Sequence, residues 1–142
     1  NRKNLTPVAI REAVYLVNYL TSKKKQTLDY DKIASGIFTQ PEVGHIGLGE
    51  NDLQKRNINY KILQTEFKPL KYAFSNKNNP VFIKVLYQPK TEKIFGIIYI
   101  GESAAEIIQS LAISFAKTFT LNDLRNTVPV HPTSSEELVT LV

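Results

Sequence analysis

The stretch PVFIKVLYQPKTEKIFGIIYI, residues 80–100, decides the predicted fold. Two runs rich in Val, Ile, Tyr and Phe, residues 80–88 and 94–100, flank the polar segment PKTEK, and this composition favours strands. A loop this short joins antiparallel neighbours, because a parallel pair needs a crossover of about a dozen residues or more. The stretch therefore predicts a β-hairpin, and a third strand is expected at residues 60–67.

Two longer segments have the spacing of amphipathic helices. Apolar residues recur every three or four positions through residues 6–21 and again through residues 103–119. Thr6 is a good N-cap for the first, and Pro7 suits its first helical position. Because the apolar stripe of a helix must be buried against another element, the order of elements predicts an α+β domain, an antiparallel β-sheet with helices packed on one face.

Shorter elements complete the prediction. Residues 34–39 are β-prone, and a short helix is expected at residues 51–56. The glycine-rich GHIGLGE between them, residues 44–50, lacks the spacing of a phosphate-binding loop and is expected to form a turn. Thr120 and Asp123 have the spacing of a capping box for another short helix.

The tail VPVHPTSSEELVTLV, residues 128–142, holds the candidate chemistry. Thr133 and Glu136 have the spacing of a capping box, which places His131 in the loop before a helix. Glu136 or Glu137 can reach back to the ring, fixing its tautomer and leaving the other nitrogen to exchange a proton. The alternative interpretation is a surface histidine beside a box that only caps a helix.

Composition narrows the function classes. The 142 residues suit one domain, and the absence of cysteine excludes disulfides, thiolate metal sites and cysteine nucleophiles within this chain. With two histidines, no metal site is expected. No apolar run reaches the roughly 18 residues that cross a bilayer, so we expect no membrane partner and a cytoplasmic location.

The charge of the chain suggests one further alternative. The net charge is +5, but apart from KKK at residues 23–25 the basic residues are scattered. Nucleic acid is therefore not an expected partner. A non-catalytic basic binding module remains the alternative to an enzyme fragment.

The tail also carries a family resemblance. TVPVHPTSSEELVTL, residues 127–141, closely resembles the C-terminal active-site motif of the glutathione reductases, which are FAD-dependent pyridine nucleotide-disulfide oxidoreductases. LTPVAI at 5–10, IFTQPEVGHIGL at 37–48 and IFGIIYIGESAAEIIQ at 94–109 resemble further segments of that family, in the same order.

The resemblance implies a fragment. The family's redox cysteine pair and its two glycine-rich nucleotide-binding loops have no counterpart in this sequence. Residues 1–29 would then be the end of the FAD-binding domain with a linker, and residues 30–142 the C-terminal dimerisation domain of a homodimer. FAD and NADPH would belong to the complete enzyme, and neither is expected on this fragment alone.

The resemblance also implies a reaction. Electrons pass from NADPH through FAD to the cysteine pair, whose thiolate attacks glutathione disulfide. His131 would protonate the departing thiolate in the partner subunit's active site, and Glu136 would orient its ring. The peptide bond between His131 and Pro132 is expected to be cis.

Binding residues follow by position in the family. Thr6 and His131 would contact FAD, Asn4 and Gly36 the nicotinamide cofactor, and Glu137 and Leu70 the substrate.

One position departs from the family's pattern. Many glutathione reductases have an arginine for a carboxylate of glutathione where this chain has Val14. Trypanothione reductase also lacks it, so that enzyme or another disulfide reductase of the family is the alternative. The SSEELVTL tail fits the glutathione enzyme better.

Overall fold

The computed structural model describes residues 3–22, 25–76 and 79–142. Lys23 and Lys24 of the basic cluster lie outside this range, as do two positions of the polar segment before residue 80. The chain divides into two compact units, residues 1–31 and residues 32–142, and each is described by itself.

The N-terminal unit consists mainly of one helix, α1 (Thr6–Ser22). The expected N-cap at Thr6 is wrong. The Leu5 carbonyl accepts from the amides of Val8 and Ala9 at 3.0 and 3.1 Å, so Leu5 holds the N-cap position and Thr6 is the first helical residue. The following segment returns to the helix, where the Tyr30 hydroxyl donates to the Glu12 carboxylate.

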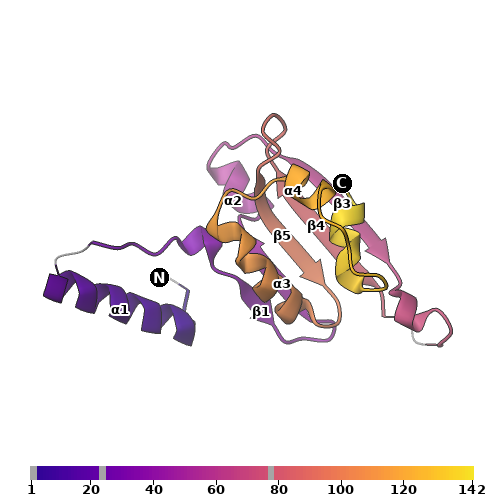
Figure 1. Ribbon diagram of the computed structural model, residues 1–142, viewed down its shortest axis with the longest axis horizontal. Coiled ribbons are helices and arrows are strands. Elements are labelled where there is room, and N and C mark those ends of the chain that lie inside the picture. The colour runs from indigo at the N-terminus through magenta and orange to yellow at the C-terminus, as the bar shows by residue number, and fades with distance from the viewer. Residues whose placement is uncertain (1–2, 23–24, 77–78) are drawn as a thin grey trace. The chain divides into compact units, whose positions relative to one another are not determined.

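A five-stranded antiparallel sheet forms the second unit (Figure 1), in the order β1-β2-β5-β4-β3. Its strands are β1 (Ser35–Ile37), β2 (Val43–Gly47), β3 (Lys61–Phe67), β4 (Val81–Tyr87) and β5 (Ile94–Ile100). The predicted hairpin of β4 and β5 is confirmed, with Val85 opposite Ile97. The predicted third strand is β3, which pairs with β4 along its whole length.

Helices cover one face of this sheet (Figure 1), which confirms the predicted α+β class. α3 is shorter than expected, because it ends at Ala112 and a separate 3₁₀ turn follows. The remaining short helix, α2, connects β2 to β3. The helical elements are η1 (Tyr30–Lys32), α2 (Glu50–Lys55), η2 (Leu70–Tyr72), α3 (Ala104–Ala112), η3 (Ser114–Ala116), α4 (Leu121–Arg125), η4 (Ser134–Glu136) and α5 (Glu137–Thr140).

Residues 44–47 of the glycine-rich segment lie in strand β2, so the turn predicted for residues 44–50 is wrong over that part. β2 lies inside the sheet, between β1 and β5. A Cβ added at Gly44 would lie 2.4 Å from the Ala104 carbonyl oxygen and 2.6 Å from Cγ1 of Ile108. Glycine is therefore required there because the backbone of α3 rests directly on the strand.

Two sets of polar contacts hold α4, the helix that precedes the tail. The predicted capping box is confirmed, since the Thr120 hydroxyl accepts from the Asp123 amide at 3.2 Å and the Thr120 amide donates to the Asp123 carboxylate at 2.8 Å. Arg125 in α4 makes a two-pronged ion pair with Glu92 in the β4–β5 loop, at 2.5 and 2.9 Å. The segment leading to His131 thus leaves from a fixed point.

Packing at Gly44 gives the first prediction. Gly44→Ala should lower the free energy of unfolding by about 1–3 kcal/mol, the usual effect of an overpacked core. Urea denaturation followed by circular dichroism measures this loss. The control is Gly49→Ala, whose added Cβ meets only a carboxylate oxygen at 3.6 Å, so that only the modest N-cap preference for glycine is lost. Equal losses in the two variants would contradict the close contact with α3.

Candidate active site

The structure brings His131 and Glu136 together. Nδ1 of His131 lies 3.0 Å from Oε2 of Glu136. The histidine side chain is 71% exposed, whereas that of Glu136 is only 14% exposed. A carboxylate can only accept, so Nδ1 carries the proton. The pair therefore has a fixed tautomer and a ring that faces outward.

Thr133 builds the turn that carries this pair. Its hydroxyl accepts from the Glu136 amide at 3.2 Å and donates to the Val130 carbonyl at 2.8 Å. The predicted capping box forms only in part, because the Glu136 carboxylate bonds to His131. The peptide bond between His131 and Pro132 is cis, as expected.

The buried residue Leu138 anchors the turn to the sheet. It lies in α5 at 3% exposure and belongs to the same core cluster as Ile83, Ile97 and Tyr99 of the central strands. Burying a leucine side chain contributes about 1.5–3 kcal/mol. The His131–Glu136 pair is therefore carried by an exposed turn that continues into a short helix held by one buried leucine.

The free nitrogen of the ring gives the turn its chemical capability. Among the described residues, nothing hydrogen-bonds Nε2 of His131. A ring that is held through Nδ1 and open at Nε2 can give a proton to a departing group or take one from it. Any group that exchanges this proton must approach from outside the turn.

A polar hollow of about 300 Å³ lies beside the turn. Its lining includes Leu70 of η2, the predicted substrate residue, and residues 132–135. Lys71 pairs with Glu102 at 2.8 Å and Tyr72 donates to the same carboxylate, and the bond to Glu102 raises the pKa of Lys71. The sequence did not reveal this link, because no spacing connects η2 with the residue after β5.

The other predicted residues have separate locations. Asn4 and Thr6 lie in the N-terminal unit, whereas His131 lies in the second unit. Gly36 lies in β1, where an added Cβ would be 2.9 Å from Cβ of Ala105, so helix packing accounts for this glycine. The Glu137 carboxylate accepts from the Thr140 hydroxyl at 3.1 Å.

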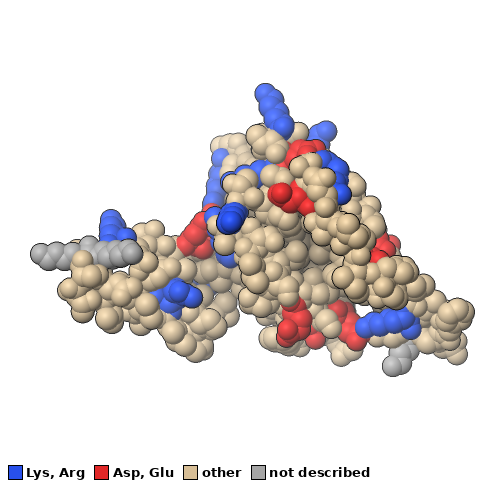
Figure 2. Space-filling model, in the orientation of Figure 1, with Lys and Arg blue, Asp and Glu red and all other residues tan. Residues whose placement is uncertain are grey.

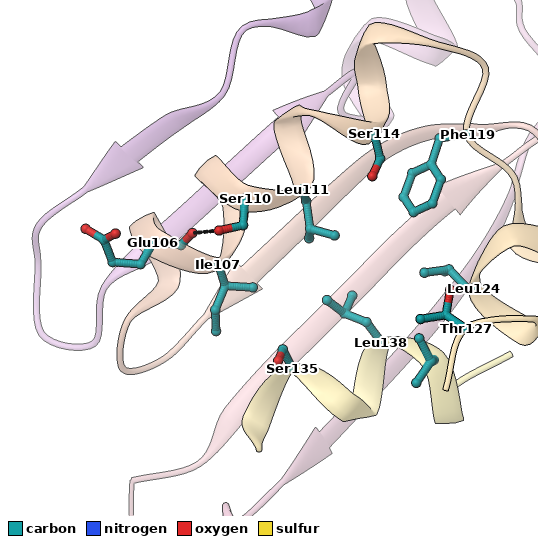
Figure 3. A pocket seen from close by; sticks show the side chains of 11 residues that line it. Glu106, Ile107, Ser110, Leu111, Ser114, Phe119, Leu124, Thr127, Ser135 and Leu138 are labelled. Atoms are coloured by element: carbon teal, nitrogen blue, oxygen red, sulfur yellow. Dashed lines mark hydrogen bonds between the residues drawn. The ribbon is translucent and has the colours of Figure 1, made fainter. Parts of the chain in front are cut away.

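A second, mainly apolar groove of about 450 Å³ runs between α3 on one side and α4 and α5 on the other. Figure 3 shows Ile107 and Leu111 of α3 facing Leu138 of α5 across it. Its polar groups are mostly hydroxyls, and the Ser110 hydroxyl already donates to the Glu106 carbonyl at 3.0 Å. This groove offers packing surface and has no titratable pair like that of the turn.

Charge and metal-ligand patterns add little to the site. Basic and acidic side chains are interspersed on the face seen in Figure 2, and the Lys84 ammonium pairs with Glu50 at 2.7 Å. Within residues 3–22, 25–76 and 79–142, no group of three or more His, Asp or Glu side chains is arranged to hold a metal ion. A search of the same ranges finds no helix long and apolar enough to cross a bilayer.

Comparison with known proteins identifies the fold. LpdA from Mycobacterium tuberculosis superposes with a TM-score of 0.75 at 18% identity, over 96% of this chain and 30% of that one. The family model for the pyridine nucleotide-disulphide oxidoreductase dimerisation domain matches residues 33–142.

Sequence relatives agree with this match. Glutathione reductase of Pisum sativum is 36% identical over 141 residues, covering 99% of this chain and 26% of the relative. Glutathione reductase of Nostoc is 34% identical, covering 99% and 31%. Trypanothione reductase of Leishmania donovani is 33% identical, covering 99% and 29%. The chain thus spans less than a third of these relatives, and it belongs to the pyridine nucleotide-disulphide oxidoreductase family, whose dimerisation domain it contains.

Proposed function

We propose that this chain is the C-terminal part of an NADPH- and FAD-dependent glutathione-disulfide reductase. Its role is to supply a dimer interface and a histidine–glutamate acid–base pair to the disulfide site of the partner subunit. The observation that carries this proposal is the bond from Nδ1 of His131 to Glu136, which leaves Nε2 open at an exposed turn.

His131 acts on the sulfur that leaves. A cysteine thiolate of the complete enzyme attacks one sulfur of the substrate, a new disulfide forms, and the second sulfur departs as a thiolate. The proton on Nε2 of the protonated ring moves to that thiolate. The proton on Nδ1 stays on the ring, where its bond to Glu136 keeps the ring in the same orientation. A positioned acid of this kind contributes roughly 10² to 10⁴-fold to the rate.

Exposed apolar residues just before the turn and at the end of α3 support a subunit interface. Val128 is 89% exposed and Val130 is 73% exposed, immediately before His131. Ile113 at the end of α3 is 76% exposed. A partner that covers these side chains and the adjacent apolar groove removes water from the ring's surroundings. Homodimerisation is therefore part of the proposal, and the fragment alone is inert.

Residues 1–29 are proposed to end a FAD-binding domain, with residues 30–142 forming the dimerisation domain. α1 exposes several large apolar side chains that a neighbouring domain would cover. These are Ile10, Val14, Leu16, Val17, Tyr19 and Leu20.

Cofactor contacts would be few in this chain. The start of α1 presents backbone amides and partial positive charge, which suit an electron-rich ring system at Thr6. Flavin bound there would relay electrons from the nicotinamide cofactor to the cysteine pair. Asn4 and Gly36 are the proposed contacts of the nicotinamide cofactor, and His131 is the proposed flavin contact from the partner side.

Glutathione disulfide is the proposed substrate, with Leu70 and Glu137 near it. The hollow that joins Leu70 to the His131 turn supports the first of these contacts. Val14 replaces the arginine expected for a glutathione carboxylate, and a trypanothione reductase is among the relatives. Comparing kcat/KM for the two disulfides decides between these substrates.

Replacing His131 gives the second prediction. In the full-length enzyme, His131→Ala should reduce disulfide turnover by roughly 10² to 10⁴-fold, because the departing thiolate loses its acid. Flavin reduction by NADPH should stay largely intact in stopped-flow absorbance. The matched control is the other histidine in the β2 strand, as His45→Gln, which should keep turnover. Equal loss of both half-reactions in His131→Ala would contradict the assignment.

The third prediction concerns the orienting carboxylate. Glu136→Gln keeps the shape of the side chain but weakens the bond to Nδ1, so turnover should fall less than in His131→Ala. Steady-state assays of both variants across a range of pH make the comparison. An unchanged rate would remove Glu136 from the mechanism.

A further inference from the structure

A pair of opposite charges borders the polar hollow beside the His131 turn. The Lys71 ammonium lies 2.8 Å from Oε2 of the Glu102 carboxylate, and both residues line the hollow of about 300 Å³. Their side chains are 50% and 48% exposed. The bond to Glu102 raises the pKa of Lys71, so its ammonium is charged at physiological pH. The hollow therefore presents one positive and one negative group at the same place.

Each of these groups can take more than one partner. An ammonium has three donors, and an ionised carboxylate has about four acceptor positions. The Lys71 ammonium and the Tyr72 hydroxyl both bond to the same oxygen of Glu102, Oε2. An ion pair as exposed as this one contributes little to the stability of a fold. Sharing the pair with a ligand therefore costs little.

The walls of the hollow connect the pair to the His131 turn. They include Leu70 of η2, Ser103 and Ile107 at the start of α3, and residues 132–135 of the turn. Apolar side chains and hydroxyls thus share the lining. Because residues 132–135 directly follow His131, a ligand group in the hollow lies beside the turn that carries the proposed proton donor.

The paired charges select the kind of ligand that fits. An isolated anion would be attracted by Lys71 and repelled by Glu102, and an isolated cation would meet the reverse. A zwitterionic amino-acid end, with an ammonium and a carboxylate on one carbon, complements both groups through charge-assisted hydrogen bonds. Glutathione has one such end, its γ-glutamyl residue, whereas its glycine end has a carboxylate alone.

We infer that the Lys71–Glu102 hollow binds the γ-glutamyl end of glutathione disulfide. The ligand carboxylate accepts from the Lys71 ammonium, and the ligand ammonium donates to the Glu102 carboxylate. This inference rests on the proposed function for the choice of substrate. Lys71 and Glu102 are specificity-determining residues that hold one end of the substrate beside the turn and do not touch the reacting sulfurs.

The test measures binding of glutathione disulfide to the oxidised full-length enzyme by isothermal titration calorimetry, without NADPH so that no turnover occurs. Lys71→Gln and Glu102→Gln should each raise Kd about fivefold, because each loses a charge-assisted hydrogen bond at a partly exposed site. Lys68→Gln is the matched control. Its ammonium donates to the Ser75 carbonyl at 3.3 Å and lies outside the lining of the hollow, so Kd should stay unchanged.

N-acetylated glutathione disulfide separates a ligand contact from a structural effect. Its γ-glutamyl ammonium groups are replaced by neutral amides, so the parent enzyme should bind it about fivefold more weakly. Glu102→Gln should have no further effect on this ligand, whereas Lys71→Gln should still weaken its binding. Equal weakening of both ligands by Glu102→Gln, or an unchanged Kd for the unmodified disulfide in either variant, would overturn the inference.

Turnover with NADPH separates this inference from the proposed function. Lys71→Gln and Glu102→Gln should raise KM and keep kcat. If the parent binds glutathione disulfide through Lys71 but does not reduce it, the proposed function fails and the inference stands. If the parent reduces it and Lys71→Gln binds it equally well, the inference fails and the function stands. If the parent does not bind it, both fail.

Discussion

The Glu136 carboxylate has two possible partners, and the site depends on which one it takes. As the last residue of a Thr-x-x-Glu box it could bond back to the Thr133 amide, but it bonds to Nδ1 of His131 instead. The Thr133 hydroxyl still accepts from the Glu136 amide, so the turn keeps one capping bond while the side chain is released to the ring. One residue thereby helps to start a helix and holds the imidazole ring of His131.

The fold gives this small turn a rigid support. α3 rests on β2 at Gly44 with no space for a side chain, and the resulting layer buries Leu138 of α5 against the central strands. The two-pronged pair of Arg125 and Glu92 fixes the chain shortly before the tail. Stability is concentrated in the sheet and α3, whereas the exposed ring depends on a few directional bonds.

Local patterns in the sequence predicted much of this architecture. The β4–β5 hairpin follows from strand composition around a short polar loop, and the cap at Thr120 follows from its spacing to Asp123. β2 was missed because glycine weakens the local signal for a strand, and the close contact that requires Gly44 comes from α3, a helix more than 50 residues later in the chain. The N-cap of α1 was misplaced by one residue. Threonine is a residue type favoured at N-caps, but here Leu5 holds that position and accepts through its backbone carbonyl.

The site was predictable to the extent that its bonds are local. His131 and Glu136 are five positions apart, so the tail alone indicated their pairing. The paired side chains of Lys71 and Glu102 border the same region from distant parts of the chain. Their meeting depends on strand register and on the path of η2, which local patterns do not encode.

His131 and its bonded partner Glu136 occur within one six-residue segment of a single chain. Both groups come from the same polypeptide, so an assembly of intact copies and copies that lack this segment would contain turns with both groups or with neither. A partial loss of activity in such a mixture would be an average over sites that have both groups and sites that have neither.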